Sequence, residues 1–115
     1  MMRTAFIGAT KFGLRCLDLI HHMDCCEAVG VVTAPAIFTI SYQPSGMKNI
    51  LHADFPSYCK SQEISCVEMS TGMKDSALFD QVCKWSPDIF IVVGWYHLIP
   101  KKWRQLAPCY RLHAS

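Results

Sequence analysis

Short apolar runs alternate along this 115-residue chain with segments that repeat apolar residues at helical spacing. The apolar runs are continuous and do not alternate with polar residues, which is typical of parallel strands buried on both faces. Both observations predict an α/β fold with a doubly wound parallel sheet. Right-handed crossovers then give an expected strand order of 3-2-1-4-5, in a three-layer, Rossmann-like arrangement.

The first half of the chain supplies two of the predicted strands. Thr4–Gly8 is an apolar run that ends at a glycine, and Ala28–Val32 is a second such run. Residues 35–44 have no clear period and are predicted to form a loop. Residues 47–61 have an irregular helical stripe, which Pro56 should break or kink. The helix expected between the two strands carries a clearer stripe, formed by Phe12, Cys16, Leu17 and Ile20.

The second half of the chain continues the alternation. Ile64–Met69 is the third predicted strand, and Ile89–Val93 is the strongest strand signal because five apolar residues follow one another. Ala5–Gly8 and Ile89–Val93 are expected to be the two central strands. A short helix over 101–106 leads into a last strand that begins at Cys109. The helix before Ile89 has one apolar face, formed by Leu78, Phe79, Val82 and Trp85.

Composition and charge exclude several classes of protein. Hydrophobic residues make up 51% of the chain, and no apolar run approaches the ~20 residues of a membrane helix. The N-terminus does not resemble a signal peptide, so the expected location is the cytoplasm. The formal charge of +2 without a basic run gives no reason to expect nucleic-acid binding through this segment.

The seven cysteines predict reduced thiols rather than a disulfide framework. Their number is odd, they are scattered, and none forms a C-x-x-C pair. His21 and Cys25 are four residues apart and could share a helix face, but two ligands do not make a zinc site. No bound metal is therefore predicted.

The first loop does not match a nucleotide-binding motif. In "GATKFG" the position that must allow close approach of a pyrophosphate is occupied by Thr10. The second strand ends in Thr33 rather than in an acidic residue, and Leu14 and Arg15 stand where a P-loop needs lysine and serine or threonine. We therefore expect Gly8 to allow a tight strand-to-helix turn.

In a doubly wound sheet, ligands bind outside the carboxyl ends of the strands, beside the point where the strand order reverses. Residues 8–11, residues 94–100 and His113 fall at this edge of the predicted sheet. Arg111 stands two positions before His113 in the last strand, so both side chains are expected to project from the same face.

Four stretches of the sequence resemble the N-terminal domain of the folate-dependent formyltransferases. They are "AFIGATKFGLRCLDLI", "VGVVTAP", "SPDIFIVVGWYHLIPKKW" and "LHAS", and with the order of elements they span nearly the whole chain. The family includes methionyl-tRNA formyltransferases and enzymes that formylate amino sugars carried on nucleotides. The pairing of "VVGWYHLIP" with "LHAS" is the specific part, and "WYHLIP" with "ISY" is closest to the amino-sugar branch.

The resemblance implies transfer of a formyl group from 10-formyltetrahydrofolate to the primary amine of an acceptor. His113 takes the place of the family's catalytic histidine, and Arg111 takes the place of its asparagine. Three roles for Arg111 stay open: donating to an oxyanion, filling the formyl pocket, or binding an anionic acceptor. The resemblance also implies that one loop walls the folate pocket, formed by Trp95, Tyr96, His97, Leu98, Ile99 and Pro100.

The resemblance further implies that residues 1–115 are an N-terminal, formyl-folate-binding domain that stops inside its active-site motif. The chain by itself is then expected to be inactive. Its last strand would lie at an open sheet edge, where self-association is expected. The alternative is a non-catalytic fragment or degenerate relative that keeps the fold and a weak folate site.

Overall fold

Five parallel strands form the centre of the molecule in the order β5-β2-β1-β6-β7. The structure is a computed structural model that describes residues 1–35, 37–40, 43–48 and 52–112. When the five strands of this sheet are numbered in chain order, without the two strands of the separate hairpin, the order is 3-2-1-4-5, as predicted. Every pair of neighbouring strands is parallel. The strands are β1 (Met2–Gly8), β2 (Cys26–Thr33), β5 (Cys66–Glu68), β6 (Ile89–Val93) and β7 (Cys109–Leu112).

The two central strands are confirmed. β1 pairs with β6 from Thr4↔Ile89 to Gly8↔Val93, and β2 lies on the other side of β1. Each central strand therefore has a neighbour on both edges, which agrees with its continuous apolar sequence.

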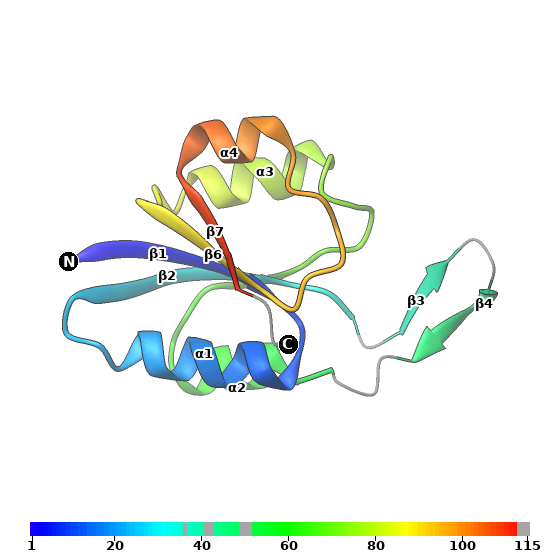
Figure 1. Ribbon diagram of the computed structural model, residues 1–115, viewed down its shortest axis with the longest axis horizontal. Coiled ribbons are helices and arrows are strands. Elements are labelled where there is room, and N and C mark those ends of the chain that lie inside the picture. The colour runs from blue at the N-terminus through cyan, green and yellow to red at the C-terminus, as the bar shows by residue number, and fades with distance from the viewer. Residues whose placement is uncertain (36, 41–42, 49–51, 113–115) are drawn as a thin grey trace.

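Helices cover both faces of the sheet (Figure 1). One face carries α1 (Lys11–His21) and α2 (Phe55–Ser61), and the other carries α3 (Ser76–Cys83) and α4 (Lys101–Leu106). No helix within the described ranges is both long enough and apolar enough to cross a membrane.

Alternate residues of the strands enter two separate cores. Phe6 and Val93 belong to a buried cluster with Leu17 of α1 and Phe55 of α2. Ala5, Ile7, Phe90 and Val92 belong to a second buried cluster that reaches α3 and α4. The predicted apolar face before β6 is confirmed, since Leu78, Val82 and Trp85 are buried and Phe79 packs against them.

The stripe predicted for α1 is only partly correct. Leu17 is buried, and Cys16 and Ile20 pack beside the core, but the Phe12 side chain is 45% exposed. Phe12 follows Lys11, the first residue of the helix, and the buried side of that first turn is formed by Gly13 instead.

The prediction of a loop over residues 35–44 was wrong. Strands β3 (Ile37–Ile40) and β4 (Gln43–Lys48) form an antiparallel hairpin with its own two-stranded pairing. The hairpin projects away from the main sheet (Figure 1). Periodicity did not indicate these strands because they pair with each other, rather than joining the buried parallel sheet.

The helix predicted over residues 47–61 begins only at Phe55. Residues 43–48 belong to β4, and Ile50 and Leu51 lie outside the described residues. Pro56 does not break the helix but stands in its first turn, where the missing N–H has no intrahelical partner to lose. The Asp54 side chain caps this helix by accepting a hydrogen bond from the Ser57 amide at 3.1 Å.

Strand β7 lies at one edge of the parallel sheet, as predicted. Within the described ranges it pairs only with β6, and the side chain of Tyr110 is 57% exposed. Self-association through this edge stays a prediction.

Candidate ligand site at the carboxyl edge of the sheet

The loops that follow β1 and β6 are in direct contact at the carboxyl edge of the sheet. Gly94 has a φ of +60°, and a Cβ atom placed on it would lie 2.3 Å from the Thr10 Oγ1. A Cβ atom on Gly8 would lie 2.5 Å from the Val93 carbonyl oxygen. Glycine at these two positions therefore permits the close approach of two backbones.

Thr10, at the middle position of the first loop, is engaged in capping the helix that follows. Its side chain caps α1 by accepting a hydrogen bond from the Gly13 amide at 3.1 Å, and it is 7% exposed. The Thr10 side chain also packs closely against Gly94. The geometry agrees with the interpretation of Gly8 as a turn residue.

The loop formed by residues 94–100 is anchored by its tryptophan. Trp95 is 6% exposed, and its indole Nε1 donates a hydrogen bond to the Met73 sulfur at 3.1 Å. The His97 ring lies against the Trp95 ring, with 5.2 Å between centroids. Trp95 is thus part of the core beneath the loop, so its side chain is an anchor rather than an open wall.

The remaining residues of the predicted folate wall differ in exposure. Tyr96 and Leu98 are exposed, and Leu98 reaches 90%. Ile99 is half-buried, and Pro100 is the N-cap of α4. Partial burial lowers the pKa of His97, which favours the neutral ring near pH 7. The structure brings all six residues onto one loop, with two apolar or aromatic side chains facing solvent.

Arg111 reaches this same loop from β7. Its Nη1 donates to the Trp95 carbonyl oxygen at 3.0 Å, and its Nη2 donates to the His97 carbonyl oxygen at 3.2 Å. The predicted common face of Arg111 and His113 is untested, because His113 lies outside the described residues. Sequence reasoning gave no sign of the contact with the loop.

His52 is a residue at this edge that sequence reasoning missed. Its Nε2 lies 3.0 Å from the Ala34 carbonyl oxygen just after β2, and its backbone forms an isolated bridge with Thr10. The next residue, Ala53, donates its amide to the Ala9 carbonyl oxygen at 3.0 Å. His52 was overlooked because its segment was assigned to a helix, which hid the extended approach to the first loop.

Thr33 ends β2 at the same edge and is fully buried. Its Oγ1 has no hydrogen-bond partner within the described part of the chain. The interpretation that this position does not hold a ribose is consistent with the burial, since a fully covered hydroxyl cannot contact a ligand without movement.

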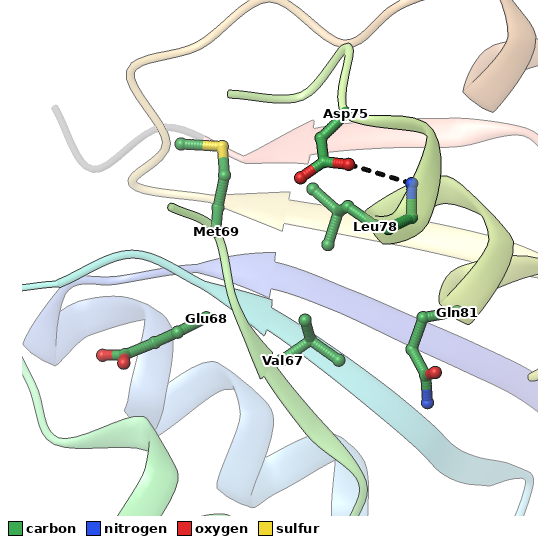
Figure 2. A pocket seen from close by; sticks show the side chains of 7 residues that line it. Val67, Glu68, Met69, Asp75, Leu78 and Gln81 are labelled. Atoms are coloured by element: carbon green, nitrogen blue, oxygen red, sulfur yellow. Dashed lines mark hydrogen bonds between the residues drawn. The ribbon is translucent and has the colours of Figure 1, made fainter. Parts of the chain in front are cut away.

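A separate hollow of about 270 Å³ lies between β5 and α3 (Figure 2). Val67, Met69 and Leu78 form apolar parts of its lining, and Glu68 points away from Val67. Hydrogen bonds from the Thr71 hydroxyl and from the amides of the first turn of α3 lower the pKa of Asp75. The Asp75 carboxylate is therefore engaged in capping the helix.

A second hollow, of about 400 Å³, is lined by Lys11, Leu14, Arg15, Asp18 and Tyr58. Neither hollow includes a residue of the 94–100 loop. The candidate site is therefore identified from the convergence of loops at the sheet edge and not from the volume of a cavity.

Metal ligands do not gather in the described part of the structure. No three side chains of His, Cys, Asp or Glu there are placed to hold one ion. All seven cysteines are free thiols, and the Cys25 and Cys26 sulfurs are 3.8 Å apart.

Comparison with known proteins adds a sequence relationship. No protein-family model matches the chain. The chain is similar to methionyl-tRNA formyltransferases from Nitratiruptor sp. (30% identity over 117 residues), Campylobacter jejuni subsp. doylei (32% over 117) and Campylobacter hominis (28% over 126). These alignments cover 99–100% of the chain and 36% of each relative. The chain thus spans about one third of the length of these curated relatives.

Proposed function

The chain is a relative of the formyltransferase N-terminal domain, and on this premise we propose that it forms the formyl-donor-binding part of an enzyme. The proposed donor is 10-formyltetrahydrofolate, and the proposed acceptor is a primary amine, either that of methionyl-tRNA or that of an amino sugar on a nucleotide. The observation that carries the proposal is the similarity to methionyl-tRNA formyltransferases over nearly the entire chain.

The loop formed by residues 94–100 is the proposed wall for the pterin. Its exposed Tyr96 and Leu98 side chains offer aromatic and apolar surface, which is typical of the walls of small-molecule sites. Anchoring of Trp95 in the core supports the proposal, because a site that is held in place loses less freedom when its ligand binds.

The proposed chemistry is acyl transfer. The amine nitrogen of the acceptor attacks the formyl carbon, and the carbonyl oxygen carries the negative charge of the tetrahedral intermediate. The bond from this carbon to N10 of the folate then breaks, N10 takes a proton, and the amine loses one. We propose that His113 polarises the formyl oxygen and handles a proton, roles that suit an imidazole near neutral pH.

Binding of folate is the first expected result. Titration of the folded protein with a stable reduced folate should give a heat signal with a Kd on the order of 1 mM or below. Leu98→Asp should weaken binding, because it places a charge on the proposed apolar wall. Leu19→Asp, at an exposed position of α1, is the matched control and should bind as the parent does. Absence of heat at millimolar folate, with circular dichroism showing a folded protein, would remove the proposal.

A non-catalytic relative that keeps a folate site is the second candidate function. The observation that favours it is the engagement of Arg111, which stands at the family's asparagine position and donates to two loop carbonyls. Turnover separates the candidates. Release of tetrahydrofolate with methionyl-tRNA or an amino sugar, lost in His113→Ala, is expected for the enzyme. Folate binding with no turnover for either acceptor would favour the second candidate.

A further inference from the structure

Arginine side chains hold three alternate carbonyl oxygens of the loop formed by residues 94–100. Arg111 donates to the carbonyls of Trp95 and His97, and Arg104 Nε donates to the carbonyl of Ile99 at 3.2 Å. Arg111 belongs to β7 and Arg104 to α4, so the backbone of the loop is hydrogen-bonded to two elements that follow it in the chain.

The Arg111 contact depends on the shape of the guanidinium group. Nη1 and Nη2 diverge from one planar group and reach carbonyls two residues apart, at 3.0 and 3.2 Å. A lysine ammonium is a point charge on a flexible stem and cannot hold both carbonyls in the same geometry. Hydrogen bonds from a charged donor are also stronger than those between neutral groups.

The same loop segment is also fixed by contacts that do not involve Arg111. The Trp95 indole donates into the core toward Met73, and Gly94 is packed against Thr10. Residues 94–97 are therefore held between the interior of the domain and the edge strand. Loss of Arg111 would free the backbone at Trp95 and His97 while leaving the indole anchor in place.

We propose that Arg111 is a positioning residue that fixes the backbone of residues 95–97, and with it the surface that receives the formyl donor. Each of its terminal nitrogens donates one N–H to a loop carbonyl, so the orientation of the guanidinium is set by the loop. Of the three roles that the sequence left open, none describes this contact. The clamp itself stands on geometry, and only its effect on the folate rests on the proposed function.

Limited proteolysis with chymotrypsin tests the clamp without any ligand. Tyr96 and Leu98 are exposed cleavage positions inside the loop. Arg111→Gln should raise the rate of cleavage after these two residues by on the order of tenfold, because the carbonyls of Trp95 and His97 lose their hydrogen bonds from a charged donor. Arg111→Lys should behave nearly as Arg111→Gln does. Fragment masses assign each cut, and thermal unfolding reports on the fold as a whole.

Arg3 provides the matched control at the opposite end of the sheet. Its guanidinium donates to the carbonyls of Trp85 and Ser86, so Arg3→Gln removes hydrogen bonds of the same kind. A general loss of stability would raise cleavage in both variants, whereas a local clamp predicts faster cleavage after Tyr96 and Leu98 only for the Arg111 variants. Equal cleavage of parent and Arg111 variants at these two sites would overturn the proposal.

Folate titration of the same variants tests the positioning role. The expected result is a several-fold weaker Kd for Arg111→Gln and Arg111→Lys alike, with Arg3→Gln unchanged. Full affinity in Arg111→Lys, with the loop open to protease, would show that charge rather than loop position matters, and would overturn the positioning role. If the parent binds no folate, the proposed function fails, while the protease result still decides the clamp.

Discussion

Replacement of Trp103 by alanine is expected to lower the free energy of unfolding by about 3–5 kcal/mol. The side chain is fully buried, and its ring centroid lies 5.8 Å from the ring centroids of Phe79 and Phe90. It joins α4 and α3 to the central strand β6, so its removal leaves a cavity at the junction of three elements. Urea unfolding followed by circular dichroism measures the loss.

Trp103→Phe is the control for this cavity. The indole Nε1 is buried without a hydrogen-bond partner in the described part of the chain, so phenylalanine removes an unsatisfied donor as well as volume. We expect a clearly smaller loss for phenylalanine than for alanine. If alanine costs no more than phenylalanine, the packing assigned to this ring would be wrong.

Replacement of Gly94 by alanine is expected to lower the free energy of unfolding by about 2–5 kcal/mol. Two causes add. The φ of +60° disfavours any residue with a Cβ atom, and that atom would lie 2.3 Å from the Thr10 Oγ1. Because Thr10 also caps α1, relief of the overlap disturbs the start of the helix. Folate binding should weaken together with stability, since the 94–100 loop begins at this glycine.

Gly72→Ala separates the two causes. Gly72 has a φ of +100°, but a Cβ atom added to it would meet nothing within 4 Å. The variant should lose only the conformational part, about 1–2 kcal/mol. Measurement of both variants by urea unfolding gives the steric contribution as the difference. Equal losses would mean that the loops relax freely, and the close packing of Gly94 on Thr10 would be refuted.

The parallel sheet could be predicted from the sequence because its signal is local. Runs such as Ile89–Val93 are apolar at every position, and a strand buried on both faces requires this composition wherever it lies. The hairpin at residues 37–48 could not be predicted in the same way, because its strands pair with each other outside the buried sheet. The prediction that Pro56 breaks or kinks a helix was wrong, because proline disrupts a helix in its interior but is tolerated in the first turn, where Pro56 lies.

The candidate site, too, has features that could be predicted from the local sequence and features that depend on tertiary contacts. That the loops after β1 and β6 meet at the carboxyl edge could be predicted from the sequence, since parallel strands direct all their carboxyl ends to one side. The contacts that these loops make with one another could be found only in the folded molecule. Arg111 is 16 residues from Trp95 along the chain, and no sequence periodicity relates the two residues. Parallel pairing of β7 with β6 brings the Arg111 guanidinium to the loop that follows β6. A long side chain binds whichever groups lie near it in the folded molecule. Residues that are far apart along the chain become neighbours only after the strands have paired.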